Sequence, residues 1–217
     1  MIGDPEPDQV YLVDADAPTR ASLRRLLQPL AYPIAEYGSA EDFLAAADLH
    51  AAGCLLVDVD LPGISGITLH ARLRAAVSAI AVVFITANTD VATAVECMRH
   101  GAITYLMKPA REQQLLDVVN RALRKSKVAA TRAKAERTVL NLLARLTARE
   151  REVLVRLADG MPHEDISREL GIAKRTVEAH RRRIMEKMGA RTVPHLLHQL
   201  AHVGWPEKPI GHHPAAR

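Results

Sequence analysis

The sequence predicts two structural units, an α/β unit with a five-stranded parallel sheet covered by helices on both faces and an all-α unit of four helices. Three observations lead to this prediction. Short apolar runs alternate with longer amphipathic stretches in the first half, as expected for repeated strand–helix pairs. The charge is divided, with 8 basic and 15 acidic residues over 1–119 (net −7) and 21 and 10 over 120–217 (net +11). Residues 171–188 read as a tight turn and a basic helix.

The first unit covers residues 1–125, and its elements follow from the periodicity of its apolar residues. The predicted strands are Val10–Asp14, Ile34–Tyr37, Cys54–Asp58, Ala81–Thr86 and Tyr105–Met107. The predicted helices are Thr19–Leu30, Ala40–Ala47, Gly66–Ala76, Val91–His100 and Glu112–Lys125. In a parallel sheet built this way, functional residues gather at the carboxyl ends of the strands.

Residues 126–146 are basic and alanine-rich, and we expect a helical linker that extends the last helix of the first unit. The second unit, 147–205, opens at Thr147, which matches a capping box together with Glu150. Its other three helices are expected at His163–Leu170, Lys174–Met188 and Val193–Val203. Gly171 is placed to end the first of these three. The tail 206–217 contains three prolines and is predicted to be disordered.

Composition narrows the class of protein. Cys54 and Cys97 both lie in apolar segments, which favours buried, reduced thiols over a disulfide. The N-terminal residues do not have the pattern of a signal peptide, and no apolar run approaches the length of a membrane span. We therefore expect a cytoplasmic protein. Its basic half suits a polyanion, and its acidic half suits a metal ion or a protein partner.

Four polar residues lie at or just after predicted strand ends: Asp14, Asp58, Thr86 and Lys108. The segments around them read Val-Asp-Ala-Asp at 13–16, Leu-Val-Asp-Val-Asp-Leu-Pro-Gly at 56–63, Phe-Ile-Thr-Ala at 84–87 and Met-Lys-Pro at 107–109. Together they resemble the receiver domain of bacterial two-component response regulators, which has a flavodoxin-like fold. The second unit resembles a LuxR-type helix-turn-helix domain. The combination is similar to the FixJ/NarL class of response regulators.

This resemblance implies a role for each matched residue. Asp58 would accept a phosphoryl group, since a carboxylate can act as a nucleophile toward phosphorus. Lys108, followed by a cis peptide bond to Pro109, would pair with the phosphoryl oxygens. Thr86 and Tyr105 would move together as the switch that reports phosphorylation. Asp14 and Asp58 would help to hold Mg²⁺.

The chain departs from the family's acidic pair. Ala15 stands where the family normally has a metal-ligating acid, and Asp16 is expected to face elsewhere. Asp60 lies two residues beyond the phosphoacceptor, where it could replace the lost ligand or repel a phosphoryl group. The leading interpretation is phosphoryl transfer from a sensor histidine kinase to Asp58. The alternative is a phosphorylation-independent regulator whose receiver docks a protein or ligand.

The basic helix predicts contact with double-stranded promoter DNA. On a helical wheel Val177, Ile184 and Met188 share one side and would dock on the core, which leaves the opposite side for the DNA groove. The candidate DNA-binding residues are Lys174, Arg175, Thr176, Glu178, Ala179, His180, Arg182 and Arg183. Glu164 and Asp165 would repel phosphate if they faced it, and Ala173 lacks a capping side chain at the helix start.

Other features suggest partners and alternatives. The last helix is expected to pair two copies on a symmetric DNA site, and RNA polymerase is an expected partner. His195, His198 and His202 share a face of this helix, where surface histidines are commoner than a metal site. An enzyme of a different class, an Asp-based phosphatase, is a remote alternative suggested by Asp58-Val-Asp60. The Leu61-Pro62 that follows argues against it, so we expect no metabolic enzyme.

Overall fold

The first unit is an α/β fold, which confirms the predicted fold class. The computed structural model describes residues 8–87 and 91–205, and its contacts divide the chain at Thr131–Arg132. One parallel sheet has the order β2-β1-β3-β4-β5. Its strands are β1 (Gln9–Val13), β2 (Ile34–Tyr37), β3 (Gly53–Val57), β4 (Ala81–Thr86) and β5 (Thr104–Met107). Each lies within one residue of its predicted bounds.

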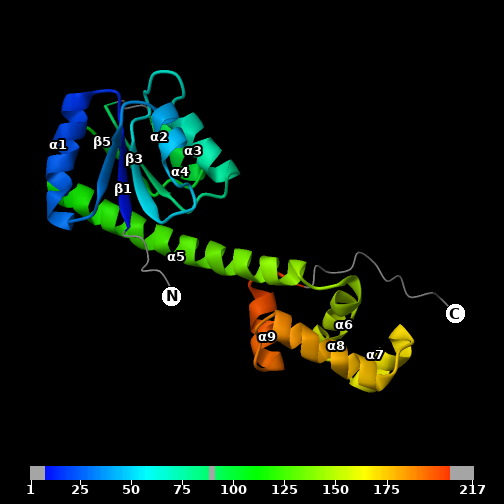
Figure 1. Cartoon of the computed structure of the whole chain (residues 1–217). Helices are drawn as coiled ribbons and strands as arrows, with labels where there is room; N and C mark the ends of the chain where they lie inside the picture. The colour runs from blue at the N-terminus through cyan, green and yellow to red at the C-terminus, as the bar shows by residue number, and fades with distance from the viewer. Residues whose placement is uncertain (1–7, 88–90, 206–217) are drawn as a thin grey trace. The chain divides into compact units, whose positions relative to one another are not determined.

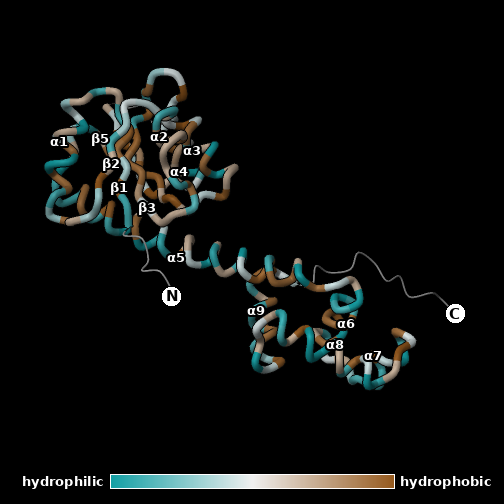
Figure 2. The backbone as a smooth tube through the Cα atoms, viewed as in Figure 1, coloured by the Kyte–Doolittle hydropathy of each residue, from teal (hydrophilic) through white to brown (hydrophobic). Residues whose placement is uncertain are grey.

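Helices cover both faces of this sheet (Figure 1). Alternate strand residues face opposite sides, so Leu56 packs beneath α1 and α5 whereas Leu55 packs beneath α2, α3 and α4. The apolar colour of the inner strands in Figure 2 reflects this burial on both sides. The helices are α1 (Ala17–Leu27, followed by the 3₁₀ turn η1, Gln28–Leu30), α2 (Ala40–Ala46), α3 (Gly66–Ala75), α4 (Val91–Arg99) and α5 (Glu112–Ala144).

Side-chain caps fix the starts of three of these helices. Asp16, Ser39 and Ser65 each precede a helix and accept a hydrogen bond from a backbone N–H in its first turn. These bonds satisfy donors that have no partner within the helix. Because each cap directly follows a strand or its loop, the caps also determine where the loops at the carboxyl edge of the sheet end.

The helix α5 is continuous through the stretch predicted as a linker. It buries Leu115, Val119, Leu123 and Ser126 in the first unit and Val139 and Leu143 in the second, and Leu146, just after the helix, is also buried there. Residues 127–138 between them are exposed or half-buried. Residues 126–146 therefore contribute to both cores, with an exposed middle portion.

The second unit consists of the end of α5 and four helices packed around one apolar core. The four helices are α6 (Ala148–Ala158), α7 (His163–Leu170), α8 (Lys174–Lys187) and α9 (Val193–Ala201). Gly171 ends α7 in the left-handed conformation at φ 63°, which glycine adopts at little cost. The short turn from Gly171 to Ala173 then leads into α8, as predicted. The predicted disordered tail, 206–217, lies outside the described residues.

A buried ion pair holds α6 to α8. Glu150 is 2% exposed, and its carboxylate accepts bonds from the Thr147 N–H at 2.8 Å and the Lys187 Nζ at 2.7 Å. The first of these bonds completes the predicted capping box. Burial alone would raise the pKa of Glu150, but the bonds from Lys187 and Thr147 outweigh it and lower this pKa.

This pair makes the second unit acid-sensitive. Because the folded pKa of Glu150 lies below its unfolded value of 4.5, its contribution is complete above pH 4.5 and is lost as the pH falls through the folded pKa. The Glu150→Gln variant should lose about 1–2 kcal/mol of unfolding free energy at pH 7 and show a weaker dependence below pH 4.5. Urea unfolding of the full chain, followed by Trp205 fluorescence, measures both.

Glu152→Gln is the matched control for that prediction. Glu152 lies in the same helix and pairs with Arg149, but both side chains are at least 36% exposed. Its loss should cost about 0.5 kcal/mol or less. Equal effects of the two substitutions would show that burial of the Glu150 pair has no special weight.

Candidate functional site

The first candidate site lies at the carboxyl edge of the sheet. Asp14 follows β1, Asp58 follows the neighbouring β3, Thr86 ends β4 and Lys108 follows β5. Parallel pairing aligns these strand ends, so residues up to 94 positions apart in the sequence meet at one place. The structure thus brings Asp14 and Asp58 into direct contact with Lys108.

Lys108 bridges the two carboxylates. Its Nζ lies 2.5 Å from Asp14 Oδ2 and 2.6 Å from Asp58 Oδ2. The side chains are 18% exposed for Lys108, 3% for Asp14 and 13% for Asp58. Burial alone would lower the pKa of Lys108, but the hydrogen bonds and charges of the two aspartates raise it. Lys108 is therefore a permanent cation between two acids, of which Asp58 is the more accessible.

Thr86 and Tyr105 occupy the next two strands at the same edge. Thr86 is fully buried, and Tyr105 is half-buried against the cluster that contains Phe84, its partner in the β4–β5 register. The peptide bond between Lys108 and Pro109 is cis, as the resemblance implies.

The other acids nearby have different roles. Asp16 is exposed, and its carboxylate accepts bonds from the Thr19 N–H and hydroxyl, which lower its pKa. Its side chain caps α1. Asp60 is exposed, and its N–H donates to Asp58 Oδ1 at 3.2 Å. Within residues 8–87 and 91–205, no group of three His, Cys, Asp or Glu side chains is arranged to hold a metal ion.

Three supporting residues were not anticipated from the sequence. A Cβ on Gly66 would lie 2.1 Å from the Asp58 carbonyl oxygen, so only glycine lets α3 start this close to the site. Glu41 accepts the Ile64 N–H at 2.9 Å and holds the loop after Asp58. Arg20 donates to the Asp14 carbonyl oxygen at 2.5 Å. Of these three residues, only Gly66 had a signal in the sequence, namely the Leu-Pro-Gly-x-x-Gly spacing after Asp58.

The second candidate site is the exposed side of α8. Val177, Ile184 and Met188 are fully buried in the core of the second unit, as the helical wheel predicts. The opposite side is accessible to a ligand. Its exposed members are Lys174, Arg175, Thr176, Glu178, Arg182 and Arg183, and Ala179 and His180 are half-buried.

A shallow groove of about 650 Å³ runs along this side. Arg175, Arg181, Arg182 and Arg191 line it, with Glu178 as the one acid among its lining residues. Four guanidinium groups around a single carboxylate produce a positive potential suited to phosphate. Ala179 lies between the arginines, where its small side chain leaves room for a base edge.

The acids ahead of α8 are paired. Glu164 receives a hydrogen bond from Lys174, which lowers the pKa of Glu164 and raises that of Lys174. Asp165 pairs with Arg168 at 3.0 Å. These pairs partly neutralise the repulsion of phosphate that the sequence suggested. Ala173 makes no side-chain capping bond at the start of α8, as expected.

The remaining candidates do not form a site. The rings of His198 and His202, at the end of α9, lie edge to face with centroids 4.8 Å apart, but in the described part of the chain no group of three metal-ligating side chains includes them. Cys54 and Cys97 are both buried, and burial raises the pKa of Cys54 far above its usual value. No helix among the described residues is long and apolar enough to cross a membrane.

An α/β unit with a lysine-bridged acidic pair, followed by a helix-turn-helix with an arginine-lined face, defines a two-domain signalling regulator that binds DNA. Residues 10–120 match the family described as response regulator receiver domain, and residues 144–200 match bacterial regulatory proteins of the luxR family. The chain therefore belongs to the response regulators of transcription that carry a LuxR-type DNA-binding domain.

Individual relatives cover nearly the whole chain. The tetrathionate response regulatory protein TtrR of Salmonella typhimurium is 36% identical, over 93% of this chain and 96% of its own. The transcriptional regulatory protein FixJ of Azorhizobium caulinodans is also 36% identical, over 89% and 92%. Among solved structures, the response regulator StyR has a TM-score of 0.79 at 35% identity and covers 90% of this chain and 98% of its own. The match thus includes both units.

Proposed function

We propose that Asp58 accepts a phosphoryl group from a sensor histidine kinase. The contact of Lys108 with both Asp58 and Asp14 is the observation that carries this proposal. A carboxylate oxygen of Asp58 attacks phosphorus while the bond from phosphorus to the kinase's imidazole nitrogen breaks, and the imidazole keeps that electron pair and takes up a proton. Lys108 then exchanges a carboxylate partner for a phosphoryl oxygen. This step changes a protein switch and converts no metabolite.

Mg²⁺ fits this pocket as a site with few protein ligands. Mg²⁺ in proteins is commonly held by one or two carboxylates and keeps several waters. Asp14 and Asp58 converge on Lys108 and supply two carboxylates, whereas Ala15 supplies none and Asp16 caps α1. Asp60 is the nearest further acid in the loop. When bound, the ion would neutralise charge on the phosphoryl group; Asp14 and Asp58 would hold it, and Lys108 would move to make room.

Thr86 and Tyr105 would carry the signal away from Asp58. Thr86 ends β4, the strand next to β3, at the same carboxyl edge of the sheet, and Tyr105 lies on the adjoining strand β5. A new phosphoryl oxygen offers the Thr86 hydroxyl an acceptor, and movement of Thr86 frees space for the Tyr105 ring. We expect this movement to promote formation of a homodimer on promoter DNA. The regulator would act in the cytoplasm, with RNA polymerase as a further partner.

The side of α8 that carries Arg175, Ala179 and Arg182 would enter the major groove. Lys174, Thr176, His180 and Arg183 would contact the phosphate backbone at its flanks. Glu178 could accept from a cytosine amino group or orient an arginine. The buried stripe of α8 fixes its rotation, so these side chains face outward as a set.

A phosphodonor test addresses the proposal directly. The full chain incubated with acetyl phosphate and Mg²⁺ should gain the mass of one phosphoryl group in intact mass spectrometry. The Asp58→Asn variant should gain none, because an amide does not act as the nucleophile. Size measurement of the same samples should show a dimer only where the mass has increased.

Asp60→Asn is the matched control, since Asp60 is an exposed acid two residues away. It should still gain the phosphoryl mass. Absence of any gain in the wild-type chain, with acetyl phosphate and with a histidine-phosphorylated kinase, would favour the phosphorylation-independent alternative. DNA binding by α8 would remain untouched by that result.

A further inference from the structure

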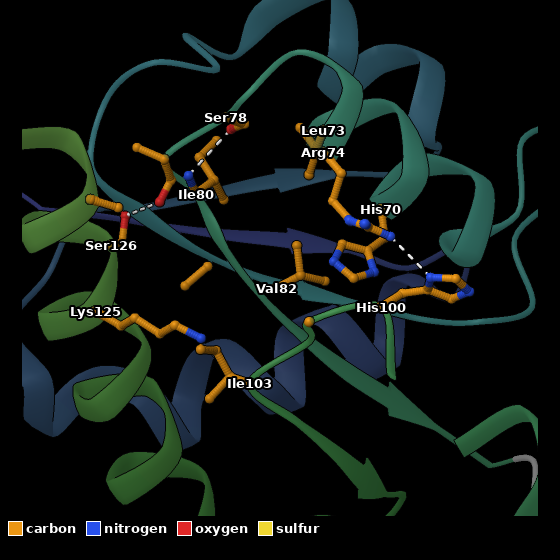
Figure 3. A pocket seen from close by; sticks show the side chains of 14 residues that line it. His70, Leu73, Arg74, Ser78, Ile80, Val82, His100, Ile103, Lys125 and Ser126 are labelled. Carbon is orange, nitrogen blue, oxygen red and sulfur yellow. Dashed lines mark hydrogen bonds between the residues drawn. The ribbon is translucent and has the colours of Figure 1, made fainter. Parts of the chain in front are cut away.

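A cavity of about 260 Å³ lies in the first unit at the amino ends of β4 and β5, at the opposite end of the sheet from Asp58. It is bounded by the ends of α3 and α4, by the loop that enters β4, and by α5 (Figure 3). Its apolar wall includes Leu73, Ile80, Val82 and Ile103. A volume of this order accommodates a small organic molecule and exceeds what a single inorganic anion requires.

The polar part of the wall is cationic. Arg74 and Lys125 both line the cavity, and no aspartate or glutamate is among the lining residues. The Arg74 Nη1 lies 2.9 Å from His100 Nδ1, which orients the guanidinium group (Figure 3). Among the residues that the structure describes, neither Arg74 nor Lys125 has a carboxylate partner. Two uncompensated cations beside an apolar wall favour an amphipathic anion.

His70 supplies a third polar group from within the wall. It is 5% exposed and lines the cavity, with its ring edge-on to Phe84 at 5.6 Å. Burial, reinforced by the charges of Arg74 and His100, lowers the pKa of His70 and so favours the neutral form of the ring. Its nitrogens have no hydrogen bond to any described residue. Because His70 lines the cavity, a ring nitrogen can hydrogen-bond a ligand oxygen there.

We propose that this cavity binds a small carboxylate with an apolar body. The carboxylate pairs with Arg74 and Lys125 and accepts a hydrogen bond from His70, and the body packs on Leu73 and Val82. The site does not require phosphorylation of Asp58.

Such a ligand would also contact α5. Ser126, which accepts the Gly53 N–H at 2.8 Å and donates to the Ala79 carbonyl at 2.7 Å, fixes α5 to the sheet beside Lys125. The bound carboxylate therefore rests on the last anchored turn of α5 before its exposed middle portion.

Titration of the full chain with benzoate tests the proposal. Two-dimensional NMR spectra should show saturable shifts at the amides of residues 78–82 and 101–103, together with a rise in Tm. Because the basic second unit attracts any anion, the location of the shifts is part of the readout. Inorganic phosphate, titrated in parallel, should give smaller shifts at these amides.

Two variants and one control locate the site. Arg74→Gln and Lys125→Gln should each weaken benzoate binding about tenfold or more, as expected for loss of a charge-assisted hydrogen bond. Arg72→Gln, an exposed arginine on the same helix that does not line the cavity, should bind like wild type. No shift at these amides with benzoate, wild-type benzoate affinity in the Arg74 and Lys125 variants, or tighter binding of phosphate than of benzoate would each overturn the proposal.

Discussion

Replacing Lys108 with methionine is expected to lower the unfolding free energy of the first unit by about 3 kcal/mol at pH 7. The Nζ contacts Asp14 and Asp58 at 2.5 and 2.6 Å, and the two carboxylates are only 3% and 13% exposed. Without the cation, two nearly buried like charges face one another. The variant should therefore regain stability as the pH falls and one of the acids binds a proton. Wild type should not gain in this way.

Far-UV circular dichroism of the full chain in urea measures this loss, and Trp205 fluorescence in the same samples should show the second unit unchanged. The double variant Lys108→Met/Asp14→Asn should recover much of the stability, because one of the charges is gone. Added Mg²⁺ should stabilise the single variant more than wild type, since Lys108 no longer competes for the carboxylates. Lys127→Met is the control, because Lys127 is 62% exposed and pairs with Asp8 at 3.8 Å. A Lys108 variant as stable as this control would contradict the bridging role.

The elements of the sheet could be predicted because buried parallel strands leave a strong signal. Ile34–Tyr37 and Ala81–Thr86 match their predicted bounds, and the others differ by one residue at one or both ends. Each is a short apolar run next to an amphipathic helix, and burial on both faces requires that composition. The strand-end position of Asp14, Asp58, Thr86 and Lys108 followed from the same runs. What the runs do not contain is strand order, which decides that Asp14 and Asp58 become neighbours.

The path of α5 was harder to predict. Its apolar residues serve two cores, with Leu115, Val119 and Leu123 packed in one and Val139 and Leu143 in the other. The intervening residues pack in neither, so no single heptad or helical stripe runs through the whole segment. Periodicity measured across both cores therefore looks irregular although the helix is unbroken.

Side-chain reach also lies beyond a sequence pattern. The motif around Lys108 indicates a cation at the strand edge, but only the structure shows that its Nζ contacts both acids. The cavity lined by His70 corresponds to no sequence motif. Its two cations, Arg74 on α3 and Lys125 on α5, are 51 positions apart in the sequence. Sites assembled by tertiary packing from unpatterned positions have no local signal to read.

The second large effect is expected at α8, where Arg182→Ala should weaken binding to duplex DNA by about 1–3 kcal/mol. Arg182 and Arg175 are seven residues apart on one side of the helix and line the same arginine-rich groove. If Arg182 contacts phosphate, the slope of log K against log salt should also fall by about 1. If it reads a base instead, affinity for a preferred sequence falls while the salt slope changes little.

Fluorescence anisotropy with a random-sequence duplex at several salt concentrations measures the phosphate contribution. Arg137→Ala is the charge-matched control, since Arg137 is exposed on α5 and does not line the groove. Glu178→Gln should change affinity in the opposite direction, because it removes the one acid lining the groove and strengthens its positive potential. Misfolding would weaken DNA binding in both variants, so it would not explain a lower affinity in the Arg182 variant together with a higher affinity in the Glu178 variant. Equal affinities for the Arg182, Glu178 and Arg137 variants would place the DNA contact on another surface of the second unit.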